Sequence, residues 1–311
     1  MDMGKNKTQV AMFEFSGLTD NEKLVPFLFV FFLFVYMVTI LGNVGMMVIV
    51  HISPSLYTPM YYFLNYLSMV DLFYSSAVTP KMLSDLLSEK KQISFIGCAL
   101  QLCFFAGLAS TEVFVLTSMA YDRYVAICHP LHYVTIMTKK KCQGMILAAF
   151  LFSIVQSTSS TSCLFTLQYC GPNLLDHFYC DIPPILKLSC SDTRSCDILT
   201  VFFVCVGTVS TLTTILVSYT LIILAILQIK SSKGQQKAFS TCSSHLMCAT
   251  IFYVTVFITY LHPSSNHLEK QNKVASVFYA MVTPMLNPLI YSLRNQEVKR
   301  VILQLLQKHE H

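Results

Sequence analysis

Asp122 and Arg123 form an adjacent acid–base pair at the end of a long apolar run of residues. Charged side chains inside a bilayer are costly unless they lie at the lipid boundary or perform a task. Pro130 and the lysines at 139–141 follow, so we interpret the pair as the inner end of a membrane helix that opens onto a basic loop. Because a guanidinium stays charged and offers five donors, Arg123 suits a switch that pairs with Asp122 in one state and reaches a partner in another. The simpler alternative is an interfacial arginine that extends its head to water.

Asp71 and Glu112 are the acids that stand deep within apolar stretches. Intramembrane acids are functional candidates by default. Glu112 precedes Arg123 by three helical turns, which places both on one side of a helix, about 16 Å apart. The two carboxyl groups could hold a sodium ion among oxygen ligands. Alternatively, one acid stays protonated in a hydrogen-bonded network, because burial and a neighbouring like charge both favour its neutral form.

Two further clusters could suggest chemistry. His177 and Cys180 have a spacing that could bind a soft metal, although a loop fixed by a disulfide at Cys180 explains them better. Ser243, Ser244 and His245 contain a nucleophile and a base, but no acid is placed to complete a triad. We therefore expect no enzymatic activity and no cofactor other than the possible sodium ion.

The composition indicates which elements must position these residues. Of the 311 residues, 54% are hydrophobic and 12% charged, and the mean hydropathy is +0.57. Soluble domains usually carry about 25% charged residues. Seven windows are long and apolar enough to cross a bilayer, at 24–50, 59–80, 93–121, 142–166, 198–229, 238–261 and 274–293. Only helices satisfy their own backbone in lipid, so the sequence predicts an all-α membrane protein, a seven-transmembrane helix bundle. Scattered basic residues argue against nucleic-acid binding.

An odd number of spans puts the two termini on opposite sides of the membrane. Lys and Arg are divided almost evenly between the two sides, so the positive-inside rule does not decide the orientation. Cys170, Cys180 and Cys190 lie in the polar loop 167–197, and Cys98 begins the third window on the same side. Disulfides persist in oxidising compartments, although four cysteines allow three pairings.

The sequon at Asn6 agrees with an extracellular N-terminus at the plasma membrane. We expect an extracellular tail at 1–23, a receptor domain at 24–293 and a cytoplasmic tail at 294–311. In that last segment Val298, Val301, Ile302 and Leu305 recur at helical spacing, which predicts a short amphipathic eighth helix on the membrane surface.

Several ordered blocks resemble those of olfactory receptors of the tetrapod type (class II), a branch of the rhodopsin-like G-protein-coupled receptors. The blocks are Gly42-Asn43, residues 56–61, residues 67–72, residues 119–133, Ser218-Tyr219, residues 237–246 and residues 284–295. Departures are few: Tyr57 stands where the family usually has His, Met69 where Phe is common, and Val254 where Gly is frequent.

The resemblance assigns roles to particular residues. It implies an activation switch and G-protein contact formed by Asp122, Arg123, Tyr124, Tyr219, Asn287, Pro288 and Tyr291. It also implies disulfides between Cys98 and Cys180 and between Cys170 and Cys190. The expected partner is a heterotrimeric, stimulatory olfactory-type G protein that raises cyclic AMP.

The expected ligand is a small neutral odorant bound in the outer half of the bundle. The pocket segments carry no acid, Lys or Arg, so an ammonium ligand would have no counter-charge. The expected ligand contacts are Phe105, Ala106, Ala109, Ser110, Phe203, Gly207, Val256, Phe257 and Tyr260. A transporter is the alternative class, but the two halves show no repeat of interrupted helices. A non-olfactory receptor of the same superfamily is another alternative, which the block at 237–246 argues against.

Overall fold

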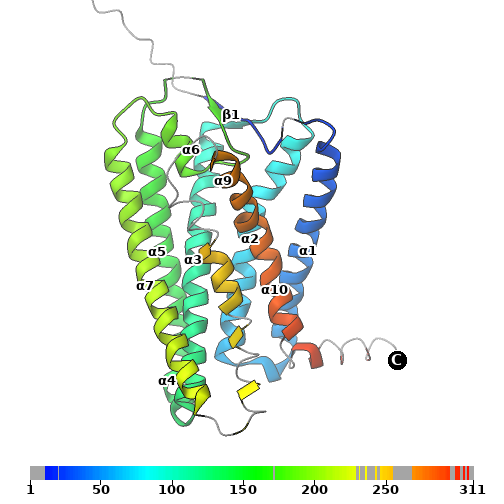
Figure 1. Ribbon diagram of the computed structural model, residues 1–311, viewed down its shortest axis with the longest axis vertical. Helices are drawn as coiled ribbons and strands as arrows, with labels where there is room; N and C mark the ends of the chain where they lie inside the picture. Colours follow the sequence, from blue (N-terminus) through cyan, green and yellow to red (C-terminus); the bar gives the residue numbers. More distant parts are fainter. Residues whose placement is uncertain are drawn as a thin grey trace, which may run out of the picture.

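The long elements of this computed structural model are helices, and three short strands lie at one end (Figure 1). The structure describes residues 11–19, 21–170, 172–228, 231, 235–236, 242–243, 246–254, 268–294, 298–301, 304 and 307. The long helices are α1 (Val25–Ile52), α2 (Pro59–Leu86), α3 (Phe95–Cys128), α5 (Lys139–Thr166) and α7 (Arg194–Leu227). The last span consists of α9 (Leu268–Val277), a π-helical turn (Phe278–Val282) and α10 (Thr283–Arg294). The short helices are η1 (Pro54–Leu56), η2 (Pro130–His132), α4 (Tyr133–Ile136) and α6 (Ile182–Lys187).

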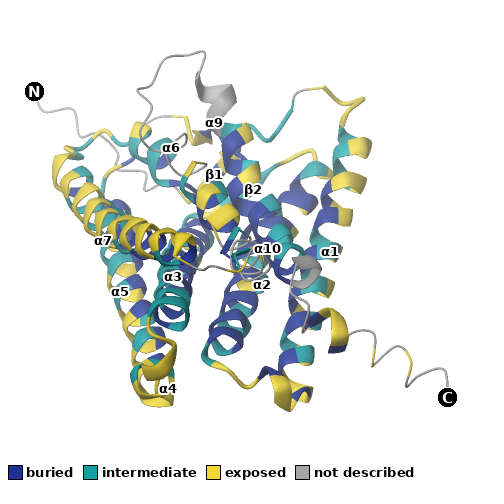
Figure 2. Cartoon of the chain, turned by 60° about the horizontal axis from the view of Figure 1, so that its bottom comes forward, coloured by how far each residue is buried: buried dark blue, intermediate teal, exposed yellow. Residues whose placement is uncertain are grey.

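Helix α3 runs through the middle of the bundle and packs against α2, α5 and α7, while α1 packs against α2 and α10. Exposed residues lie on the outer surface of the bundle, as along α1 (Figure 2). Large apolar side chains are among them, including Phe27, Val30 and Phe34 of α1. Such a surface is stable where lipid rather than water surrounds it. Buried positions instead face the neighbouring helices.

Five of the seven predicted windows correspond to helices that are long and apolar enough to span a membrane. These are Val25–Ile52, Phe95–Cys128, Lys139–Thr166, Arg194–Leu227 and Lys273–Tyr291. Helix α2 has a similar length but carries Asp71, Lys81 and Asp85, which lower its hydropathy. The sixth window, 238–261, is described only at 242–243 and 246–254, where it is helical.

Several helices extend beyond their apolar windows. Helix α2 continues to Leu86, and α3 continues to Cys128, so Asp122 and Arg123 lie within α3 rather than at its end. A hydropathy window marks the part of a helix that lies in lipid, whereas the backbone hydrogen bonds continue into the interfacial region. At the start of α5, the hydroxyl of Thr138 accepts a hydrogen bond from the backbone N–H of Lys141 (3.3 Å).

A glycine lies at the close contact between α1 and α10. A Cβ atom added at Gly42 would lie 3.1 Å from Cγ of Pro288, which is closer than ordinary packing allows. Pro288 lies inside α10, where it cannot donate a backbone hydrogen bond. The block Gly42-Asn43 is thereby explained by close helix packing.

A small sheet lies at the end of the bundle that carries the disulfides, the end that we expect to be extracellular. Strand β1 (Met12–Phe15) pairs antiparallel with β2 (Gln92–Ser94) and parallel with β3 (Leu174–Leu175). In the observed registers, Phe13 lies opposite Ile93 and Phe15 opposite Leu175. The side chains of Phe13 and Phe15 are buried, because strand alternation turns both towards the loop core. Residues 12–15 of the expected N-terminal tail are thereby paired with the outer loops; Asn6 lies outside the described residues.

Three disulfides close the outer loops. Cys98 pairs with Cys180, and Cys170 pairs with Cys190, as the family resemblance implied. A third bond joins Cys163 to Cys196 and was not foreseen. Cys163 lies inside the apolar window 142–166, where the sequence does not distinguish a bonded cysteine from a small buried side chain.

The described part of the C-terminal segment agrees with an amphipathic helix. Residues 298–301 are helical, with Val298 and Val301 buried and Lys299 and Arg300 exposed. Ile302 and Leu305 lie outside the described residues.

Replacing Cys98 by Ser should prevent the protein from reaching the cell surface. The bond to Cys180 closes a loop of 82 residues, so in the chain-entropy model its loss costs about 4–5 kcal/mol. Cys103→Ser is the matched control, because this thiol on the same helix is free. Surface labelling of intact cells measures the effect. Equal surface levels for the two variants would contradict a stabilising role for the Cys98–Cys180 bond.

Candidate functional site

A polar network in the centre of the bundle connects three helices. The side-chain amide of Asn287 on α10 donates to both carboxylate oxygens of Asp71 on α2 (3.2 and 3.0 Å) and to Oε1 of Glu112 on α3 (3.0 Å). Nearby, the amide of Asn43 on α1 donates to the carbonyl oxygens of Thr39 and Pro284, each at 3.0 Å. The side chains of the two acids and the two asparagines are at most 1% exposed.

This network still has acceptor capacity. Oε2 of Glu112 and the side-chain oxygens of Asn43 and Asn287 are buried without a hydrogen-bond partner among the described residues. Uncompensated buried carboxylates are costly, so the pair needs a proton or a cation. Oxygen atoms are the ligands that a hard cation prefers. The residues present therefore fit either of the two alternatives, a sodium ion or a protonated network.

At the other end of α3, Asp122 does not pair with its neighbour. Its Oδ1 accepts a hydrogen bond from the hydroxyl of Tyr133 (2.7 Å), and no ion pair within the described part of the chain joins it to Arg123. Adjacent residues on a helix point in different directions, so the expected Asp122–Arg123 pair is not formed in this structure. Burial and the charge of Asp122 raise the pKa of Tyr133, which keeps the phenol protonated as a donor.

The remaining predicted switch residues surround this end of α3. Tyr219 on α7 and Tyr291 on α10 are buried. The hydroxyl of Tyr124 lies 3.0 Å from Nε2 of His129. Sequence reasoning missed two apolar side chains here: Leu131 is 94% exposed and Val134 is 81% exposed. Their only sequence signal is an apolar residue within a polar loop.

A layer of aromatic rings closes the bundle below the outer loops. Phe105 is buried, and its ring lies 4.8 Å from that of Tyr74, 4.7 Å from Tyr179 and 5.3 Å from Tyr279. These rings come from α3, α2, the long loop and the π-helical turn. Phe105, an expected ligand contact, is therefore packed into this layer.

The other expected pocket residues lie on α3, on α7 and in the sixth window, and the two described next are on different faces of α3. Ala109 packs against the aromatic layer. Ser110 instead donates to Oε1 of Gln156 on α5 (2.7 Å). On α7, the ring of Phe203 contacts that of Phe152, and a Cβ at Gly207 would lie 3.7 Å from the same ring. Ala106 is partly buried, and Val256, Phe257 and Tyr260 lie outside the described residues.

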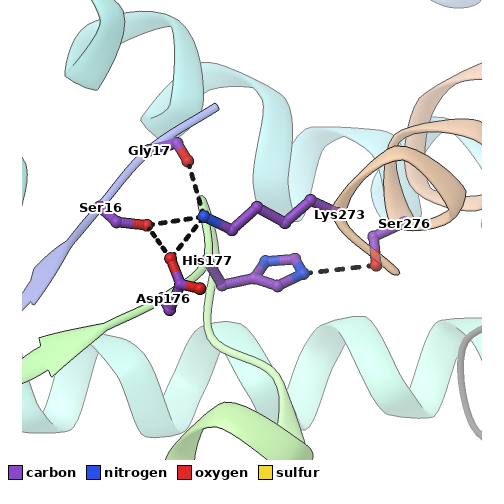
Figure 3. Close-up of polar contacts among 6 residues, drawn as sticks. All are labelled: Ser16, Gly17, Asp176, His177, Lys273 and Ser276. Carbon is purple, nitrogen blue, oxygen red and sulfur yellow. Dashed lines mark hydrogen bonds and ion pairs between the residues drawn. The ribbon is translucent and has the colours of Figure 1, made fainter. Parts of the chain in front are cut away.

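Above the aromatic layer, one lysine ties three segments together (Figure 3). The ammonium of Lys273 donates to Oδ1 of Asp176 (2.6 Å), to the hydroxyl of Ser16 (2.9 Å) and to the carbonyl oxygen of Gly17 (3.4 Å). The hydroxyl of Ser16 also donates to Asp176 (2.7 Å). The N-terminal segment, the long loop and α9 are thereby joined as a lid.

His177 lies beside this lid without being part of the ion pair. Its Nε2 lies 3.3 Å from the hydroxyl of Ser276, and its ring stacks on Phe178. Burial, and then the charge of Lys273, lower the pKa of His177 to about 3, so the ring is neutral. Because Cys180 is in a disulfide, a His177–Cys180 metal pair is excluded, and no group of three His, Cys, Asp or Glu side chains converges within the described residues.

Comparison with known proteins gives one consistent family. A family model described as "Olfactory receptor" matches residues 32–309. Mouse olfactory receptor 5AR1 is 49% identical over 98% of this chain and 98% of its own length, and human olfactory receptor 5AR1 is 48% identical over the same shares. The crystal structure of squid rhodopsin superposes with a TM-score of 0.63 at 16% identity, covering 91% of this chain and 85% of that one. The last likeness confirms the predicted seven-helix fold and nothing further.

Replacing Asp176 by Asn should remove a pH-dependent part of the receptor's stability. The hydrogen bond from Lys273 holds the pKa of Asp176 below its ordinary value. A lowered pKa contributes stability above the ordinary value, and that stability is lost as the pH falls through the lowered one. At pH 7 the free energy of unfolding of the variant should therefore be lower by less than about 1 kcal/mol, because the side chain is exposed. Its thermal midpoint should be lower as well, and both differences should vanish in acid.

Thermal unfolding of the purified receptor at neutral and acidic pH measures this difference. Asp192→Asn, a change at an exposed carboxyl group of the same loop, is the control. A midpoint difference that stayed constant into acid would show that the ion pair does not stabilise the lid.

Proposed function

This chain belongs to the olfactory receptor family, and we propose that it binds a small neutral odorant in its outer half and activates a stimulatory heterotrimeric G protein. Members of this family are multi-pass membrane receptors, not enzymes. The observation that carries the ligand class is the outer part of α3, Phe95 to Thr111, which has no ionisable acid or base and packs into the aromatic layer.

Charge decides the ligand class. An ionic ligand placed beside the aromatic layer would lose its hydration and find no opposite charge, at a cost of several kcal/mol. The charged groups above the layer, Asp176 and Lys273, neutralise each other in the lid. A neutral, largely apolar molecule loses little hydration in the same place and gains contact with the rings.

A few polar groups would orient the ligand. We expected Ser110 to contribute, but its hydroxyl proton is used on Gln156, so Ser110 can act on a ligand only as an acceptor. Val256, Phe257 and Tyr260 of the sixth window remain part of the proposed pocket on the strength of the sequence alone.

Transmission to the inner end runs through the central network in this proposal. Asn287 holds α10 to α2 and α3, so a shift of the last span changes its bonds to Asp71 and Glu112. The π-helical turn above α10 and Pro288 within it are places where that span can bend. If a sodium ion binds, Asp71, Glu112 and Asn287 would hold it, and its charge would favour the ionised pair.

The inner surface offers the G protein both charge and apolar contact. Arg123 is free of Asp122, so its guanidinium is available to a partner. Leu131 and Val134 are exposed apolar side chains on the adjacent segment, which suits the buried centre of a protein interface. Tyr133 couples the two features, because it lies in that segment and holds Asp122.

Replacing Arg123 by Ala should abolish agonist-driven cyclic-AMP production while leaving surface expression largely intact. The guanidinium acts after the odorant has bound, so its loss affects coupling rather than folding. A cyclic-AMP reporter in transfected cells, normalised to surface label, measures it. Arg194→Ala, at an exposed position at the outer start of α7, is the control and should signal normally. Full signalling by Arg123→Ala would refute the proposed switch.

An odorant panel on the same reporter tests the ligand class. Agonists should be small alcohols, aldehydes, ketones, esters or aromatics. Gly207→Leu and Ala109→Leu should each lose the response to bulky agonists before small ones, because added methylenes do not fit a packed site. Gly144→Leu is the matched control, since a Cβ there meets open space. Best agonists that are permanently charged ammonium compounds would overturn this assignment.

A further inference from the structure

A cavity of about 510 Å³ lies at the inner end of the bundle, far from the proposed odorant site. It is open to the surface on one side and is lined by the end of α1, by η1, by the start of α2 and by the segment that leads from α4 into α5. Its volume is in the range that small-molecule sites occupy. Neither the proposed odorant pocket nor the switch at Arg123 uses it.

The polar lining of this cavity is basic or hydrogen-bonding and contains no acid. Lys139 and His51 supply the basic groups, and Thr58 and Asn65 supply further donors. The ammonium of Lys139 makes no hydrogen bond or ion pair with the described residues, whereas that of Lys141 donates to the hydroxyl of Tyr121 (2.9 Å). An unpaired cation beside neutral donors, with no carboxylate opposite, complements an anion.

Two helix starts add to this positive potential. Thr58 is the N-cap of α2, and its side chain does not cap the helix. Pro59 follows at the first helical position, where a backbone N–H would have no partner within the helix. Helix α5 begins at Lys139, which also lines the cavity. The N-terminal ends of two 28-residue helices therefore flank one cavity, and each favours a negative charge.

The remaining walls are apolar. Leu56, Met137 and Cys142 are buried lining residues, and Tyr62 also lines the cavity. Above the cavity, α1 and α5 carry exposed apolar side chains at Val48 and Leu147, where the acyl chains of the bilayer would lie. At the mouth, Tyr57 is 68% exposed, and its hydroxyl holds the backbone carbonyl of His51 (2.8 Å).

We infer that this cavity binds the headgroup of an anionic phospholipid from the inner leaflet. The phosphate and its neighbouring acidic group would lie against Lys139, His51 and the start of α2, while the chains follow the apolar surface of the helices. The inner leaflet is the one that carries the anionic lipids of a cell membrane. A free phosphate shares the same charge but gains nothing from the apolar walls, so we commit to the lipid.

Competition between lipids tests this inference on the intact receptor. The full chain is purified in detergent, incubated with equal amounts of phosphatidylserine and phosphatidylcholine, and examined by native mass spectrometry. Phosphatidylserine adducts should exceed phosphatidylcholine adducts by about tenfold, which corresponds to one charge-assisted hydrogen bond. Lys139→Gln should bring this ratio close to one.

Lys140→Gln is the matched control, because Lys140 neighbours Lys139 and is exposed but does not line the cavity. It should keep the full preference for phosphatidylserine. Both variants change exposed side chains, and equal thermal midpoints would show that each folds. Inorganic phosphate and glycerophosphoserine, added as competitors, should leave the lipid adducts in place.

Three results would overturn the inference. Equal losses in Lys139→Gln and Lys140→Gln would mean that general surface charge retains the lipid. Displacement of the lipid by inorganic phosphate or glycerophosphoserine would mean that the cavity takes a free anion. A native receptor without preference between the two lipids would mean that the cavity does not select charge.

Discussion

The side-chain amide of Asn287 holds the centre of this receptor together, because it donates to two buried carboxyl groups on two other helices, and a proton or a cation must supply the rest of their compensation. One donor group serves Asp71 on α2 and Glu112 on α3, and Asn287 itself lies on α10. Any movement of α10 must therefore exchange these bonds or break them. A network of this kind has two discrete arrangements more readily than a continuous range, which is the property a switch needs.

The two ends of the bundle are built in opposite ways. The outer end is fixed by three disulfides, a three-stranded sheet and the lid in which Lys273 joins Asp176 to Ser16. The inner end has free thiols at Cys128, Cys142 and Cys242, a phenol that holds Asp122 and exposed apolar side chains. Rigidity around the proposed odorant site and open contact surface at the other end suit a molecule that binds on one side and couples on the other.

The proposed lipid site belongs to this inner end and gives it a second input. Lys139 lies just beyond the segment that contains Tyr133 and the exposed Leu131 and Val134. A headgroup bound beside Lys139 would restrain the start of α5 and, through Met137, the end of α4. The composition of the inner leaflet would thereby affect the surface that we assign to the G protein.

The helical membrane fold and the family could be predicted from the chain alone, because hydropathy over about twenty residues and ordered motifs are properties of the sequence. The pairings of Cys98 and Cys170 and the role of Asn287 followed only from the family resemblance. Asp71 and Glu112 were identified as candidates because isolated acids in apolar windows are conspicuous. Only the tertiary structure decided which groups meet. Tyr133 rather than Arg123 donates to Asp122, and Cys163 is bonded to Cys196. Phe13 and Phe15 of the N-terminal segment are buried. Those contacts join segments whose separation in space no periodicity encodes, because helix packing and loop closure set it.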